Sequence, residues 1–161
     1  MADGLSDPRQ PQRWGPALSR VVEAARGWIG TPYHHQASVR GAGADCLGLI
    51  RGVWRECYGD EPLPVPAYTA DWAEPQHDEV LDRVAHSVLL PVSDGRPMRP
   101  GEVLLFRMRD GAVAKHLGIL AMANARPSFI HAYSGHGVVE SSLSAPWLRR
   151  VTGRFDFPDT H

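Results

Sequence analysis

The sequence predicts an α+β fold in which N-terminal helices pack on one C-terminal antiparallel sheet of about five strands. Apolar residues recur at helical spacing in segments before residue 91, and short apolar runs separated by turns follow Gly101. Helices that come first and strands that come after are typical of α+β folds, whereas α/β folds alternate the two.

Helices are expected over three segments of the first half. Residues 17–29 carry apolar side chains at a helical period, residues 46–58 have a broad apolar face, and residues 79–90 again place Val and Leu inward. Gly59 directly follows the second segment and is a typical helix C-cap. Four prolines between residues 60 and 75 prevent that segment from being regular throughout.

Strands are expected after Gly101, each as a short apolar run bounded by turn residues. The turn sequences Asp110-Gly111 and Asn124-Ala125-Arg126-Pro127 separate the first of them. The predicted strands are residues 102–108, 115–122, 128–132, 137–140 and 149–157.

The length of 161 residues is typical of one domain, and a chain of this size buries a core without disulfides or metals. Residues 1–16 are polar and proline-rich and are expected to form an N-terminal arm. Residues 17–161 are expected to form a single domain with a proline-rich insertion at about residues 60–98.

The charge and hydropathy of the chain exclude several kinds of partner. The formal net charge is -1 and Lys and Arg form no cluster, so nucleic acid is not an expected partner. No apolar run approaches the roughly 18 residues of a membrane span, so no membrane insertion is expected. The N-terminus lacks a basic start followed by an apolar stretch, which predicts synthesis in the cytoplasm without a signal peptide.

The two cysteines, Cys46 and Cys57, fall on the same predicted helix. At a rise of about 1.5 Å per residue they are roughly 16 Å apart, which is too far for a disulfide. We therefore expect free thiols from a reducing compartment, with Cys57 packed in the core.

Cys46 follows the glycine-rich residues 41–45 and opens the helix predicted over residues 46–58. Backbone N–H groups are unpaired at a helix N-terminus, and the helix dipole is positive there. A thiol in this position is expected to be easier to deprotonate, and the thiolate is the attacking form. Asp45 is a favourable N-cap. The alternative is that Cys46 is an inert, buried filler, which is the commoner role of cysteine.

His116 and His131 lie on consecutive predicted strands. A turn centred near Ala123-Asn124 places the two histidines directly opposite each other, with both side chains on one face of the sheet. One histidine can then accept the proton of Cys46 while the other orients it. The expected constellation is a Cys–His–His triad.

A zinc site is a third interpretation of the same residues. Cys46, His116, His131 and Asp45 are all acceptable zinc ligands. No short-spaced ligand pair such as C-x₂-C is present, so the sequence favours no metal.

Five short motifs are Gly30-Thr31-Pro32-Tyr33, Asp45-Cys46-Leu47-Gly48-Leu49, Pro100-Gly101-Glu102-Val103-Leu104-Leu105-Phe106, His116-Leu117-Gly118-Ile119 and Phe129-Ile130-His131-Ala132. In order and spacing, from about residue 17 to residue 140, they resemble the NlpC-type cysteine peptidases of the NlpC/P60 superfamily. The resemblance implies a papain-like fold and a cofactor-free thiol endopeptidase. It implies cleavage of peptidoglycan stem peptides, typically between D-γ-glutamate and a diamino acid.

The same resemblance implies a role for each matching residue. Cys46 matches the nucleophile, His116 the base that activates it, and His131 the third polar residue, which orients the base. Tyr33 matches a tyrosine that lines the site near the oxyanion position. Asp45 matches an aspartate that helps to bind the free amine of the stem peptide.

Leu47-Gly48 departs from the Ser-Gly that often follows the nucleophile in this family. In this respect the chain resembles more closely the branch carried by phage tails and gene-transfer-agent particles. That branch implies baseplate or hub proteins as partners and location in a virion or phage-like tail. The alternative is a structural tail-tip protein with an inactive peptidase fold.

Overall fold

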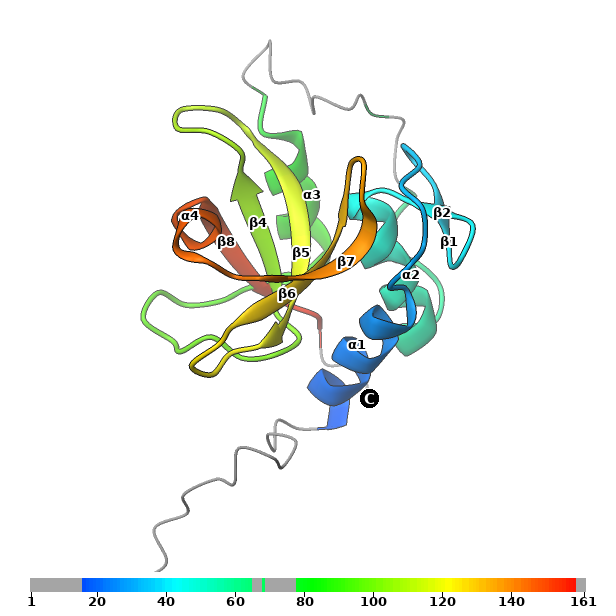
Figure 1. The fold of residues 1–161 in the computed structure, drawn as a ribbon, viewed down its shortest axis with the longest axis horizontal. Coiled ribbons are helices and arrows are strands. Elements are labelled where there is room, and N and C mark those ends of the chain that lie inside the picture. Colours follow the sequence, from blue (N-terminus) through cyan, green and yellow to red (C-terminus); the bar gives the residue numbers. More distant parts are fainter. Residues whose placement is uncertain (1–15, 65–67, 69–77, 159–161) are drawn as a thin grey trace, which may run out of the picture.

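The computed structural model describes residues 16–64, 68 and 78–158, which form helices on one side of a curved antiparallel sheet (Figure 1). The helices on this side are α1 (Pro16–Gly27), α2 (Cys46–Tyr58) and α3 (Val80–Val88). All three contact the central strand β5 (Ala114–Met122). The predicted α+β, papain-like arrangement is confirmed.

Within the described residues the main sheet has six strands in the order β3-β8-β4-β5-β6-β7, and every neighbouring pair is antiparallel. Besides β5, the strands are β3 (Leu90–Pro91), β4 (Val103–Arg107), β6 (Ser128–Tyr133), β7 (Gly137–Ser142) and β8 (Val151–Asp156). The sequence predicts all but β3, a two-residue strand that pairs with the end of β8. Such a short strand has no periodicity of its own to detect.

Three further elements were also outside the prediction. The loop before α2 contains a two-stranded ribbon of β1 (Ser38–Val39) and β2 (Gly43–Ala44). A short helix, α4 (Ala145–Arg149), lies between β7 and β8. It follows Ser144 and has a proline in its first turn, a combination that favours helix initiation.

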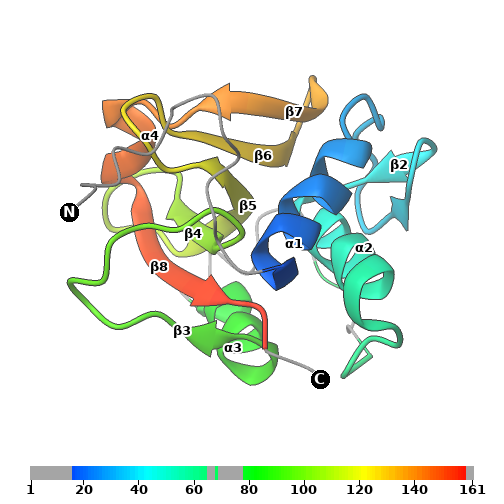
Figure 2. The same ribbon diagram turned by 90° about the horizontal axis from the view of Figure 1, so that it is seen from below.

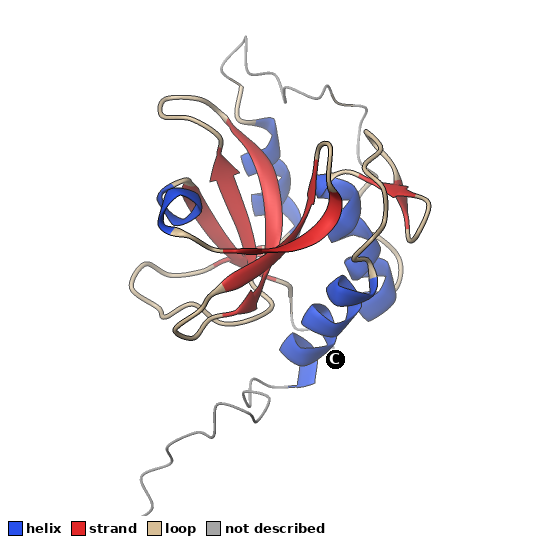
Figure 3. Cartoon of the chain, in the orientation of Figure 1, coloured by secondary structure: helices blue, strands red, loops and turns tan. Residues whose placement is uncertain are grey.

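The sheet is buried on both faces because α4 lies on the side opposite α1 and α2 (Figure 2, Figure 3). Successive residues of β4 alternate between the two sides: Leu105 belongs to the core under the helices, and Leu104 and Phe106 belong to a second cluster. Trp147 of α4 packs on that second cluster. The histidine-bearing strands therefore lie between two apolar layers.

The end of α1 differs from the prediction. Ile29 lies beyond the helix and is 46% exposed, whereas Trp28 is buried. The indole N–H of Trp28 donates to Glu56 on α2, at 2.9 Å, so Trp28 joins the two helices.

Parts of the predicted domain plan lie outside the described residues. These are residues 1–15 of the expected arm, and residues 65–67 and 69–77 of the expected insertion. In the portion that the structure describes, no helix is both long and apolar enough to cross a membrane.

Two glycines of α2 allow other segments to approach the helix closely. A Cβ added to Gly48 would lie 1.8 Å from the carbonyl oxygen of Ala37, and one added to Gly52 would lie 2.0 Å from the indole of Trp28. Neither distance is possible between real atoms, so each glycine is required by the packing against it. Gly48 brings the loop that contains Ala37 onto the first turn of α2.

We expect Gly48→Ala to destabilise the protein by about 2 kcal/mol or more, although alanine favours helices, because overpacking against a fixed backbone outweighs helix propensity. Gly52→Ala meets a side chain rather than backbone and is expected to be less damaging. Urea unfolding of both variants provides the measurement. A Gly48→Ala protein as stable as the wild type would contradict the packing described here.

Candidate active site

Asp45 fixes the start of α2 and, with it, the position of Cys46. The Asp45 backbone is extended, and its Oδ1 accepts a hydrogen bond from the backbone N–H of Gly48 at 2.7 Å. Its Oδ2 accepts the backbone N–H of Gln36 at 2.7 Å and the hydroxyl of Tyr68. The N-cap prediction is confirmed, and the same carboxylate also holds the preceding loop.

Cys46 is the first residue of α2 and is only 5% exposed. Burial, reinforced by the nearby charge of Asp45, raises the pKa of the Cys46 thiol to about 12. Backbone hydrogen bonds from Leu117 on β5, and from Leu47 and Cys46 at the start of α2, act in the opposite direction. The prediction that this thiol is easier to deprotonate is therefore wrong in its net sign, because desolvation outweighs the helix terminus.

His116 of β5 and His131 of β6 are brought together, but not in the predicted register. Ile119 pairs with Ile130 and Leu120 with Phe129, and the pairing then shifts before Met122. This register is displaced by two residues from direct opposition of the histidines, so that part of the prediction is wrong. The pair Met122–Ser128 centres the turn at Ala125 and not between Ala123 and Asn124, and the one-residue shift that follows reduces the displacement from three residues to two.

An even displacement keeps both histidine side chains on the same face of the sheet. Nε2 of His116 lies 2.8 Å from Nδ1 of His131, within hydrogen-bond distance. Gly118, two residues after His116, lies beside His131: a Cβ added to it would be 3.4 Å from the His131 Cβ and 2.7 Å from Phe129. The missing side chain leaves room for the diagonal contact.

Both histidines are buried and electrically neutral near pH 7. Burial, together with the charge of His131, lowers the pKa of His116 from 6.5 to about 3. Burial and the charge of His136 lower the pKa of His131 to about 4. Each ring therefore holds one proton and one lone pair, the state that a general base requires.

Two contacts of the histidines come from residues that sequence reasoning missed. Trp147 of α4 packs with its ring centroid 5.8 Å from His116 and 5.3 Å from His131. The Oγ atom of Ser141 on β7 lies 2.8 Å from Nε2 of His131. The helix-starting residues Ser144-Ala145-Pro146 were a usable signal for α4, whereas Ser141 depends on the pairing of β6 with β7.

The predicted site residues converge on one cavity of about 140 Å³. Cys46 and His116 line it together with Tyr33 and Asp45, and His131 lies behind His116. The other lining residues are His35, Met108, Lys115, Ala132, Tyr133 and Ser134. Burial, then the charges of Cys46 and Asp45, raise the pKa of Tyr33 to about 12, so its hydroxyl stays protonated and able to donate.

Tyr68 lies against the Asp45 side of this cavity. Its ring meets His35 edge-on, with centroids 5.1 Å apart, and its carbonyl oxygen accepts from the side-chain amide of Gln36 at 2.5 Å. The Asp45 side chain is 2% exposed, with bonds to both oxygens. Its predicted binding of a substrate amine stays a prediction.

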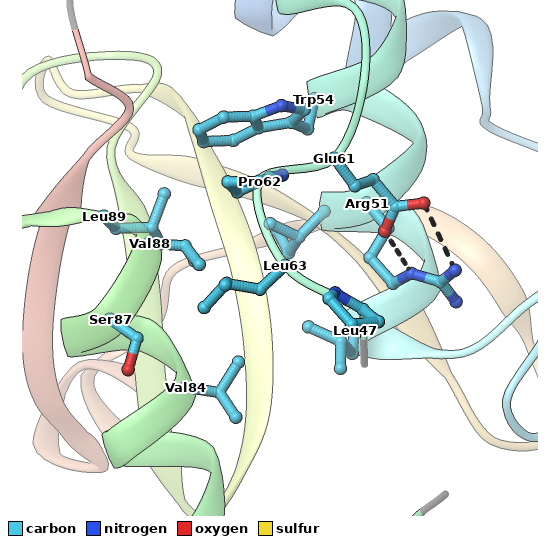
Figure 4. Close-up of a pocket in the computed structure, with 12 residues that line it drawn as sticks. Leu47, Arg51, Trp54, Glu61, Pro62, Leu63, Val84, Ser87, Val88 and Leu89 are labelled. Carbon is cyan, nitrogen blue, oxygen red and sulfur yellow. Dashed lines mark hydrogen bonds and ion pairs between the residues drawn. The ribbon is translucent and has the colours of Figure 1, made fainter. Parts of the chain in front are cut away.

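A second cavity, of about 150 Å³, lies on the other side of α2, between that helix and α3 (Figure 4). Leu47, Leu63 and Val84 point into it. Arg51 and Glu61 form an ion pair at its edge, with nitrogen–oxygen distances of 2.6 and 3.3 Å. Its lining is mostly apolar and contains none of the predicted site residues.

The remaining sequence predictions concern cysteines and metals. Cys46 and Cys57 are both free, and Cys57 is partly buried against the core. Among the described residues, no group of three or more His, Cys, Asp or Glu side chains has an arrangement that could hold a metal ion.

No family model matches the chain. Gamma-DL-glutamyl hydrolase of Bacillus subtilis (strain 168) is 32% identical over 139 residues, which are 84% of this chain and 29% of the relative. The chain thus spans less than a third of the length of that relative.

Solved structures of NlpC/P60 proteins share the fold. An NLP/P60-family protein similar to lipoprotein from Staphylococcus aureus aligns with a TM-score of 0.59 and 18% identity, over 97% of this chain and 46% of its own. An NlpC/P60 family protein from Bacillus cereus aligns with a TM-score of 0.61 and 16% identity, over 88% of this chain and 40% of its own. The NlpC/p60 domain of peptidoglycan hydrolase SagA aligns with a TM-score of 0.54 and 22% identity, over 87% of this chain and 98% of that domain. The fold is therefore the papain-like fold of NlpC/P60 proteins.

The buried histidines link stability to pH. Since their pKa values are lower in the folded chain than the ordinary 6.5, the unfolded chain binds protons more readily. The contribution of the two neutral histidines to the free energy of unfolding is complete above about pH 6.5. It is lost as the pH falls toward about 4 for His131 and about 3 for His116. We expect His131→Asn to make the free energy of unfolding less dependent on pH in this range, as measured by urea titration.

The exposed His86 provides the control for this measurement. Comparing the slope of stability against pH of His86→Gln with that of His131→Asn separates the effect of burial from the loss of any one histidine. Equal slopes for His131→Asn and the wild type would show that His131 is not buried in its neutral form.

Proposed function

We propose that this chain belongs to the NlpC/P60 family and is a thiol peptidase that cleaves peptidoglycan stem peptides. The observation that carries the proposal is the cavity in which a cysteine at a helix start and a buried, neutral histidine face the same space, with a second histidine behind the first. Structural neighbours described as NlpC/P60 proteins and a peptidoglycan hydrolase support the substrate class.

The proposed reaction begins with two neutral groups. His116 takes the proton of the Cys46 thiol as the sulfur attacks the carbonyl carbon of the scissile bond. Its Nε2 is engaged by His131, so Nδ1 is the nitrogen left to receive this proton. The His131 contact then stabilises the imidazolium that forms.

The negative charge that develops on the carbonyl oxygen requires donors. The backbone N–H of Cys46, at the start of α2, and the hydroxyl of Tyr33 are the proposed donors, each typically worth about 3–4 kcal/mol in such sites. His116 next gives the proton to the nitrogen of the scissile bond. The amine product then leaves, and the acyl group remains on Cys46 as a thioester. Water, deprotonated by His116, hydrolyses the thioester and restores the thiol.

We propose the D-γ-glutamyl–diamino acid bond as the bond cleaved. The name of the Bacillus subtilis relative, a gamma-DL-glutamyl hydrolase, supports γ-glutamyl specificity. A matched pair of peptides that differ only in α- or γ-linkage of the glutamate would distinguish this bond from an ordinary peptide bond.

We further propose that the protein acts in a phage-like or gene-transfer-agent tail, where baseplate or hub proteins place it against the cell wall. The support is the Leu47-Gly48 sequence after the nucleophile, with the resemblance to the tail-borne branch that it carries. Particles carrying Cys46→Ala are expected to assemble normally and to penetrate walls poorly. Failed assembly would instead favour a structural tail-tip role.

We expect Cys46→Ala to lose at least about a thousandfold of its hydrolytic activity, because the nucleophile of a triad is not replaced by its neighbours. The measurement is digestion of purified sacculi followed by mass spectrometry of the released fragments. Cys57→Ala is the matched control and is expected to give wild-type fragments. The same fragments from Cys46→Ala would rule out the proposed reaction.

A further inference from the structure

His131 uses both ring nitrogens. Nδ1 lies 2.8 Å from Nε2 of His116, and Nε2 lies 2.8 Å from Oγ of Ser141. Ser141 is on β7. Strands β6 and β7 pair so that Ser141 lies opposite Phe129, and Val139 lies opposite His131. The three side chains thus form a continuous line of hydrogen bonds across strands β5, β6 and β7.

The direction of these bonds follows from the role proposed for His116. To take a proton from Cys46, His116 needs its lone pair on Nδ1, so its own proton must be on Nε2. That N–H donates to Nδ1 of His131, which must therefore carry a lone pair, and the proton of His131 is left on Nε2. The Nε2–H of His131 needs an acceptor, and Ser141 Oγ is at the required distance.

We propose that Ser141 is a positioning residue whose hydroxyl oxygen accepts the Nε2–H of His131 and thereby holds both histidines in the tautomer that leaves His116 Nδ1 free to act as base. This inference rests on the catalytic role proposed for Cys46 and His116. Ser141 itself does not reach the cavity.

The burial of His131 explains why this acceptor matters. The residue is 1% exposed, so little bulk water is available to replace a lost partner. Without Ser141 Oγ, the productive tautomer leaves the buried Nε2–H of His131 without an acceptor. The reversed tautomer of His131 leaves only a lone pair without a donor. It keeps the hydrogen bond to His116, with His131 now the donor. In the reversed state the proton of His116 is on Nδ1, and the base is lost.

Two variants of equal shape separate the hydroxyl from packing. Ser141→Thr keeps the acceptor and Ser141→Val replaces it with a methyl group, while both add the same β-branch, which strands tolerate well. Ser142→Ala is the control, because Ser142 is exposed and adjacent residues of a strand point to opposite faces.

Nitrogen-15 NMR of the histidine rings reads the tautomers directly, without substrate. We expect Nε2–H on both His116 and His131 in the wild type, Ser141→Thr and Ser142→Ala. We expect a population with Nδ1–H in Ser141→Val. On stem-peptide substrate, kcat of Ser141→Val is expected to fall about tenfold relative to Ser141→Thr, with KM nearly unchanged.

A wild-type His131 protonated on Nδ1 would overturn the inference, as would equal kcat for the Val and Thr variants. If Ser141→Val fails to fold, Ser141→Ala replaces it in the same comparison with Ser141→Thr. The ring tautomers remain measurable even if no stem peptide is cleaved, so failure of the proposed function is distinguishable from failure of this inference.

Discussion

The bond from the Asp45 carboxylate to the first turn of α2 is the interaction on which the rest of the site depends. It ends the loop and starts the helix, and so places the sulfur of Cys46 where β5 passes. The second oxygen of the same carboxylate holds Gln36 and Tyr68, so one buried charge organises three segments. An N-cap is ordinarily worth about 1 kcal/mol to a helix, but here it also fixes the geometry of the nucleophile.

Burial gives the site its electrical character. The thiol and both imidazoles are all shifted toward their neutral forms, so charge develops only when the proton moves during attack. Neutral partners need directional hydrogen bonds rather than attraction between ions to be oriented. The line from His116 through His131 to Ser141 supplies that direction.

Local patterns predicted what depends on local structure. The helix start at Cys46, the cap at Asp45 and the strands that carry His116 and His131 follow from spacing and from residue preferences at helix ends. The predicted register of β5 against β6 was wrong because the turn between them is centred at Ala125, and Ser141 was missed because it meets His131 only through the pairing of β6 with β7. The net pKa of Cys46 was wrong in sign because it depends on how deeply the completed core encloses the sulfur.

The division of the site between two layers of the fold affects when activity arises during folding. The base and its supports belong to one strand meander, β5 to β7, whose contacts are close in sequence and form early in many chains. The nucleophile belongs to the helical layer and joins the base only when α2 docks on β5. A chain that is still folding therefore lacks the complete proposed set of Cys46, His116 and His131, and the proposed hydrolysis requires that the two layers have packed on each other.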